Sequence, residues 1–122
     1  MRLPRKYSIN QRETFERIRQ TGHAKAGRFV ILSTLEEASL PQLMSAFVTS
    51  KRAAKKAHDR VMIRRRLRAI LQKHAPAFAN PHRYLITIAR NGAADASFAE
   101  LEKDWLRTAK RLGLFPHNPG KP

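Results

Sequence analysis

The chain of 122 residues has no cysteine, few acidic residues and no long apolar run. Without cysteine it can form no disulfide, no thiolate zinc site and no cysteine nucleophile, which fits a reducing compartment. Its longest apolar runs, such as residues 29–32 and 84–89, are far shorter than the roughly 20 residues of a membrane span. The basic start, residues 1–8, leads into polar residues, so a secretory signal is not expected. We therefore expect a cytoplasmic protein that does not contact a membrane.

Acidic residues are scarce relative to basic ones. The 25 lysines and arginines outnumber 9 aspartates and glutamates, which gives a net charge of +16. A charge this large destabilises a compact state by self-repulsion unless a polyanion offsets it. Apolar residues nevertheless make up 42% of the chain and recur in periodic blocks, which indicates a folded protein and not a disordered basic arm. A nucleic acid is the expected partner.

The length favours one domain, residues 1–122, with an ordered core over about 5–114 and a tail over 115–122. Asn10 and Glu13 have the spacing of a capping box, which predicts a first helix over about 11–20 that ends at Gly22. Residues 27–35 and 43–49 are rich in β-branched and aromatic side chains and predict two paired strands.

A long helix is predicted over residues 53–75, which contain neither glycine nor proline. Its apolar stripe follows helical spacing and consists of Ile63, Leu67, Ile70, Leu71 and His74. Residues 84–89 predict a buried strand, and a second capping box, Ser97 with Glu100, begins a last helix that Gly113 ends. This pattern favours an α+β fold, an α/β sandwich in which a small sheet packs against helices.

The most basic part of the chain is residues 51–68. Nine basic residues and one acidic residue, Asp59, give this segment a net charge of 9 − 1 = +8. The nine are Lys51, Arg52, Lys55, Lys56, Arg60, Arg64, Arg65, Arg66 and Arg68. A solvated face stabilised by ion pairs would need more carboxylates, whereas arginine suits phosphate because its planar guanidinium donates two parallel hydrogen bonds. The segment therefore predicts phosphate binding.

The basic helix lacks the features by which proteins usually read DNA. A DNA reader usually presents a short recognition helix with base-reading Asn, Gln and Arg, or a dimer interface, and neither is evident. Recognition of RNA by its shape is therefore the favoured interpretation.

Residues 51–68, KRAAKKAHDRVMIRRRLR, resemble without a gap the signature helix of bacterial ribonuclease P protein subunits. Phe15 and Gly22 stand where that family has a phenylalanine in the first helix and the glycine after it. Residues 47–52 and 84–90 are similar to the family strands that enter the basic loop and follow the helix. The resemblance covers about residues 5–114.

This resemblance implies a specific fold. It is a small, mostly antiparallel four-stranded sheet packed with about three helices, in the order α-β-β-β-α-β-α. The family also has a left-handed βαβ crossover, an exception to the usual right-handed rule.

The resemblance also implies a function. The chain would be a noncatalytic subunit of a ribonucleoprotein endonuclease that removes the 5′ leader of precursor tRNA and leaves a 5′-phosphate. Mg²⁺ would serve the active site of the RNA subunit, and the protein would supply neither catalytic residues nor metal ligands. The RNA subunit and the leader are the implied partners, and no protein partner is predicted.

Two sets of site residues are expected. The RNA-binding set consists of Lys51, Arg52, Lys55, Lys56, Arg60, Arg64, Arg65 and Arg68. A cleft for the single-stranded leader, as implied by the resemblance, has Phe15, Arg19 and Ser33 as candidates. Phe15 is equally compatible with a place in the core.

The chain departs from the family pattern at four positions in or beside these two sets. Val61 and Met62 stand where the family has asparagine and arginine, and helical geometry puts Val61 on the face of Arg65 and Arg68. Lineage drift and weakened RNA docking both explain this difference. Arg19 and Ser33 stand where relatives often have aromatic residues, which would mean less stacking on the bases of a leader.

Two other functions remain open. One is a noncatalytic RNA-binding or ribosome-associated protein that diverged from this family. The other is a metal-dependent nuclease, for which His58 and Asp59 are the only adjacent histidine and carboxylate pair. The five histidines show no metal-ligand spacing, and the glycines form no phosphate-binding loop.

Overall fold

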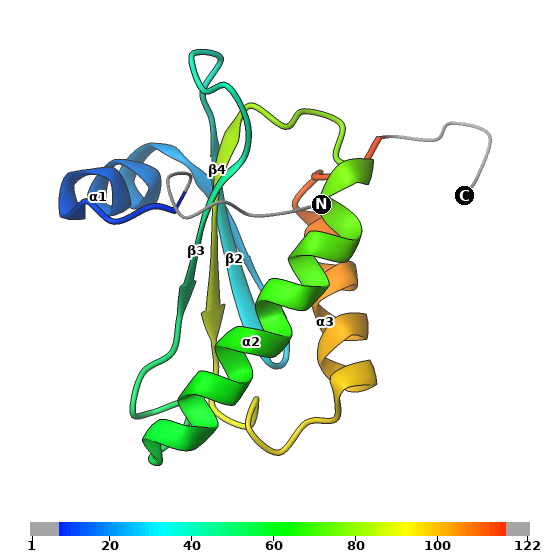
Figure 1. Cartoon of the computed structure of the whole chain (residues 1–122). Helices are drawn as coiled ribbons and strands as arrows, with labels where there is room; N and C mark the ends of the chain where they lie inside the picture. Colours follow the sequence, from blue (N-terminus) through cyan, green and yellow to red (C-terminus); the bar gives the residue numbers. More distant parts are fainter. Residues whose placement is uncertain (1–7, 117–122) are drawn as a thin grey trace.

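The computed structural model describes residues 8–116. Its elements follow the order α-β-β-β-α-β-α, which confirms the expected succession (Figure 1). They are α1 (Arg12–Thr21), β1 (His23–Ala26), β2 (Val30–Glu36), β3 (Met44–Val48), α2 (Ala57–His74), a short 3-10 turn η2 (Ala75–Ala77), β4 (Arg83–Ala89) and α3 (Phe98–Arg111). The parts of the expected core and tail at 5–7 and 117–122 lie outside the described residues.

The four strands form one sheet in the order β1-β2-β4-β3. The pairs β1/β2 and β2/β4 are antiparallel, and β3/β4 is parallel, so the mostly antiparallel sheet is confirmed. The parallel pair is connected through α2, which makes β3-α2-β4 a βαβ unit. The last strand in the chain, β4, thus lies between two strands that precede it.

Helices cover both faces of the sheet. Figure 1 shows α2 and α3 on one face and α1 on the other. The larger core lies under α2 and α3, where Trp105 is fully buried and its ring stacks on those of Phe78 and His74. A smaller cluster of Ile9, Ile18 and Ile86 lies under α1. Among the described helices, none combines the length and the apolar composition that a membrane crossing requires.

The predicted stripe of the long helix is confirmed. Ile63, Leu67, Ile70 and Leu71 are fully buried, and His74 is mostly covered. The helix itself begins later than expected, at Ala57, because a turn at residues 51–53 and a bend at 55–56 precede it, and Ala53 and Ala54 are already buried there. The capping box of Ser97 and Glu100 is confirmed, as is the left-handed Gly113 (φ +81°) after α3.

Two expectations about the N-terminal half are wrong. Asn10 and Glu13 form no capping box, because α1 begins one residue later with Gln11 as its N-cap and no side-chain cap bond. Residues 27–35 are not one strand, because residues 27–29 form the turn between β1 and β2. The strand β1 has no alternation to reveal it, since all four of its residues are exposed and it is held by backbone pairing with β2.

The turn between β1 and β2 is held by a buried carboxylate from α3. Asp104 accepts hydrogen bonds from the backbone N–H groups of Arg28 (2.9 Å), Phe29 (2.8 Å) and Val30 (3.2 Å). Burial raises the pKa of Asp104, but these bonds and the guanidinium of Arg107 outweigh it, so the pKa is lowered overall. Gly27 is required beside them, because a Cβ there would lie 2.3 Å from Thr108 Oγ1 and 2.7 Å from Asp104 Oδ2.

Replacing Asp104 by alanine should lower the free energy of unfolding by about 3 kcal/mol, because it leaves buried backbone donors without an acceptor. Because folding lowers the pKa of Asp104, its contribution is present above the ordinary value of 3.8 and is lost as the pH falls through the folded value. The difference between Asp104→Ala and the unaltered chain in urea unfolding should therefore shrink in acid. Arg107→Ala, which removes only the exposed partner, should cost no more than about 1 kcal/mol. Equal losses in both variants would contradict this role of Asp104.

Candidate nucleic-acid interface

The basic segment forms the loop before α2 and the first half of that helix. Within residues 8–116, none of its nine cations pairs with a carboxylate, since the ion pairs present there all involve other basic residues. Lys51, Arg52, Lys55 and Lys56 are exposed in the loop, and Arg65 and Arg68 are exposed on the helix. The segment thus presents positive charge that the described fold does not neutralise.

Three arginines of the segment also hold the protein together. Arg60 donates to the carbonyl oxygens of Ala54 (2.9 Å) and Lys55 (2.8 Å), which fixes the loop against the start of α2. Arg64 donates to Thr49 Oγ1 (2.6 Å) and so ties the helix to the end of β3. Arg66 bonds the Ala96 carbonyl (3.2 Å) on the other flank of the helix. These bonds position the loop and the helix, and each guanidinium keeps further N–H donors.

Arg68 connects the basic helix to the sheet edge. Its guanidinium carbon lies 5.1 Å from the centre of the Phe47 ring, a cation–π contact across α2 and β3. Arg65 makes no such ring contact within residues 8–116 and lies on the same outward face. Val61 is 45% exposed, which confirms the expectation that an apolar side chain lies on the same outward face of α2 as Arg65 and Arg68.

A hollow of about 200 Å³ joins this basic face to α1. It lies at the edge strand β3, beside the segment in which Ser8 bridges to Ser45 and the Ile9 N–H donates to the Ser45 carbonyl (2.8 Å). Phe15 contributes from α1, and Arg64 and Arg68 from α2. Phe15 also packs against the Ile9, Ile18 and Ile86 cluster. Both interpretations of Phe15 thus describe part of its environment: it is half-buried, and it lines a hollow beside two arginines.

The other two cleft candidates are not brought to this hollow. Arg19 is exposed and pairs with Glu16 (2.7 Å) on α1. Ser33 is half-buried on β2, opposite Ala24 and Ile86 in the sheet register. It shares the sheet face that α1 partly covers, but it lines no hollow with Phe15.

The sequence interpretation missed a second hollow on the α1 side. It measures about 300 Å³ and lies between the start of α1 and the starts of β3 and β4, with Tyr84, Thr14 and Gln11 in its wall. Arg17 lies 5.9 Å from the Tyr84 ring centre and also forms an ion pair with Glu37. This contact lowers the pKa of Glu37 and raises that of Arg17. An aromatic residue at the start of a predicted strand is the sequence feature that could have indicated Tyr84.

Two of the described histidines, His74 and His82, have partners within the protein. His74 Nε2 lies 2.9 Å from Glu102 Oε2, and hydrogen bonds from His74 and Lys73 lower the pKa of that carboxyl. His82 Nδ1 lies 2.6 Å from the Leu40 carbonyl. Over residues 8–116, no three His, Asp or Glu side chains come together as a metal site would require.

Comparison with known proteins places these features in context. The family model described as Ribonuclease P matches residues 3–113. The Ribonuclease P protein component of Syntrophomonas wolfei subsp. wolfei is 32% identical over 119 residues, which are 98% of each chain. The Ribonuclease P protein component of Thermus brockianus is 35% identical over 108 residues, which are 88% of this chain and 61% of that protein.

Solved structures share the fold. The RNase P protein of Staphylococcus aureus superposes with a TM-score of 0.74 at 25% identity, over 97% of this chain and 98% of that one. A 2.0 Å structure of the S. aureus protein gives 0.81 at 24% identity, over 90% and 98%. The RNase P protein of Thermotoga maritima, in complex with 1-(4-fluorophenyl)-2-thiourea, gives 0.74 at 17% identity, over 84% and 97%.

Proposed function

This chain belongs to the ribonuclease P protein family, whose members are RNA-binding subunits of an endoribonuclease in tRNA processing, and we propose that its basic loop and helix dock the catalytic RNA subunit. The observation that carries the proposal is that nine cations between Lys51 and Arg68 have no carboxylate partner among the described residues. Neutralising phosphates releases counterions from the RNA, so binding should weaken steeply with salt.

The geometry divides the docking residues into two kinds. Arg60 and Arg64 hold the loop and β3, and both remain partly exposed, with further N–H donors. The loop lysines, Arg52 and Arg65 are exposed to bind phosphate, and so is Arg68, whose guanidinium also lies against the Phe47 ring. A pre-positioned guanidinium loses less conformational entropy on binding than a mobile one, which makes Arg60 and Arg64 part of the contact and not mere supports.

The hollow at β3 is the proposed contact for the 5′ leader of precursor tRNA. Phe15 offers a ring on which a base can stack, and Arg64 and Arg68 line the same hollow, where they can bind a phosphate of the leader. Ser33 and Arg19 lie farther along the same side, on β2 and α1, as secondary candidates. The RNA-docking face and the proposed leader contact are therefore adjacent, because Arg64 and Arg68 belong to both.

Catalysis is assigned to the RNA. The proposed role of the protein is to bind and orient, in the cytoplasm, while Mg²⁺ acts at the active site of the RNA subunit. No side chain of this chain is proposed as an acid, a base or a metal ligand.

The function is tested by reconstitution with a bacterial ribonuclease P RNA. The mixture should cleave precursor tRNA at low magnesium faster than the RNA alone, and the protein free of RNA should cleave nothing. Arg65→Gln/Arg68→Gln should reduce the salt dependence of RNA binding by about 0.7 to 0.9 in log–log slope for each phosphate that is no longer neutralised. Arg65→Lys/Arg68→Lys, which keeps the charge, should retain most of the slope. Cleavage by RNA-free protein would refute this division of roles.

The leader contact predicts a selective loss in Phe15→Leu, which keeps an apolar side chain against Ile9, Ile18 and Ile86 but removes the ring. Stacking is worth about 1 to 3 kcal/mol per base, so affinity for precursor tRNA with a leader should fall about 5- to 150-fold. Affinity for tRNA without a leader should stay unchanged in the same holoenzyme. Phe98→Leu, at an exposed phenylalanine on α3, is the matched control. Equal losses for both tRNAs would assign Phe15 to the core alone.

One observation favours a second candidate function, an RNA-binding protein that has diverged from the holoenzyme. Val61 presents an apolar side chain on the docking face beside Arg65, where the family pattern has asparagine. If docking is weakened, Val61→Asn/Met62→Arg should bind the RNA subunit more tightly than the unaltered chain in a filter-binding titration. Val61→Ala/Met62→Ala controls for the loss of the apolar side chains. Unchanged affinity in the first variant would leave lineage drift as the explanation.

A further inference from the structure

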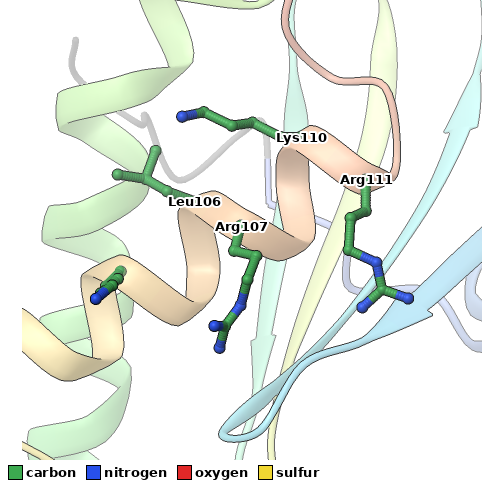
Figure 2. A pocket seen from close by; sticks show the side chains of 5 residues that line it. Leu106, Arg107, Lys110 and Arg111 are labelled. Carbon is green, nitrogen blue, oxygen red and sulfur yellow. The ribbon is translucent and has the colours of Figure 1, made fainter. Parts of the chain in front are cut away.

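A second group of cations lies on the outward face of α3, away from the docking segment. Lys103, Arg107, Lys110 and Arg111 are exposed there around Leu106. At 100° per residue these four fall within a stripe about 100° wide, and the run from the first to the last is about 12 Å long. Figure 2 shows Arg107 and Arg111 extending to one side of the helix, and Leu106 and Lys110 to the other. We call this set of five residues the α3 face.

The acidic residues of α3 do not neutralise the α3 face. Glu100 belongs to the capping box with Ser97, and Glu102 bonds Lys73 and His74. Asp104 is buried against the β1–β2 turn and pairs with Arg107 (2.9 Å). Of the four cations only Arg107 therefore has a carboxylate within residues 8–116, which leaves three without one.

The shape of the α3 face fits an extended polyanion. The aliphatic stems of the four cations and Leu106 line a shallow hollow of about 420 Å³. Lysine and arginine can lie along an apolar surface while their charged ends reach outward. An apolar floor with a cationic rim accommodates a ribose with the phosphates on either side of it. The length of the stripe allows it to face more than one phosphate.

The α3 face and the docking segment lie over different strands of the same sheet face, although α2 and α3 also contact each other. Helix α3 packs over β1 and β2, whereas α2 packs over β3. In the order β1-β2-β4-β3, the two outer strands are three strand spacings apart, about 14 Å. The hollow with Phe15 lies at the β3 edge as well, so a leader bound there is remote from α3.

We propose that the α3 face is a second RNA-contact surface, which binds a segment of the RNA subunit other than the one docked on α2. The proposal rests on the proposed function, because it takes the same RNA as its ligand. The RNA subunit is favoured over the leader because α2 and α3 cover the same face of the sheet, whereas α1 covers the other (Figure 1). The protein thereby links two RNA segments across its own width.

The first test is binding of the full chain to a bacterial ribonuclease P RNA transcript over a range of salt. Lys103→Gln/Lys110→Gln removes two charges that have no carboxylate partner among the described residues and keeps good helix formers. Its log–log salt slope should be shallower by about 1.5, from two phosphates at 0.7 to 0.9 each. Lys103→Arg/Lys110→Arg, with the charge retained, should bind as the unaltered chain does. Thermal unfolding of each variant confirms that the fold is kept.

The second test uses the absence of cysteine, which makes any introduced thiol unique. An iron chelate tethered at Lys103→Cys or at Arg65→Cys generates hydroxyl radicals that cut nearby RNA. The two positions should cut separate tracts of the RNA subunit. Cuts from Lys103→Cys that coincide with those from Arg65→Cys, that fall only on added precursor tRNA or that do not occur would overturn the α3 proposal.

The two proposals fail in different ways. An unchanged slope for Lys103→Gln/Lys110→Gln, beside a shallower one for Arg65→Gln/Arg68→Gln, overturns the α3 face as a contact and leaves docking on α2 intact. Absence of binding by the unaltered chain overturns both. A loss shared by the glutamine and the arginine variants at Lys103 and Lys110 would show that packing and not charge is responsible, which also overturns the proposal.

Discussion

The fold depends on one buried carboxylate. Asp104 on α3 accepts three backbone N–H groups from the β1–β2 turn, and no other described side chain reaches that turn from a helix with comparable bonds. This fixes the helix over the outer half of the sheet, with Trp105 beside it in the core and Thr108 against Gly27. The orientation of α3, and with it the direction in which its cations point, follows from where Asp104 is held. The buried hydrogen bonds of Asp104 thus determine which side chains of α3 lie on the surface.

Charged residues elsewhere in the molecule are divided in the same way, with acidic side chains stabilising the fold and basic side chains exposed on its surface. Four of the nine acidic residues stabilise local structure: Asp104 holds a turn, Glu102 joins α2 to α3, Glu100 caps a helix, and Glu37 holds α1 through Arg17. With carboxylates used in this way, the cations of α2 and α3 have few partners of their own. A chain with a net charge of +16 can still fold because its scarce acids are placed where they stabilise local structure. The excess of positive charge then lies on the surface, where it favours RNA.

Several elements of the fold could be predicted from the sequence, because they depend on local periodicity. The stripe of Ile63 and Leu67, the capping box of Ser97 and the stop at Gly113 each need only a few neighbouring residues to be recognised. What could not be predicted depends on contacts between distant residues. The strand β1 has no apolar alternation, and Asp104 meets a turn some 75 positions away. The bonds of Arg60 and Arg64 to the loop and to β3, and the hollow that joins Phe15 to Arg68, likewise appear only when the chain is folded. The sequence thus indicated the cluster of cations on α2, whose role in RNA binding stays a prediction, while the geometry around Phe15 and Tyr84 could not be read from the pattern.

The central position of β4 links assembly to recognition. Strand β4 pairs with both β2 and β3 but comes after α2 in the chain, so the sheet is discontinuous until the segment through Ala89 has been made and has crossed back. Closing that long connection is an entropic cost that long-range pairing must offset. The connection is the basic helix itself, whose crowded cations repel one another. A polyanion that binds only the closed form stabilises it by mass action. If RNA docks on α2 as proposed, it would also be a folding ligand, because the free energy of docking and the free energy of completing the sheet would be coupled through a single helix.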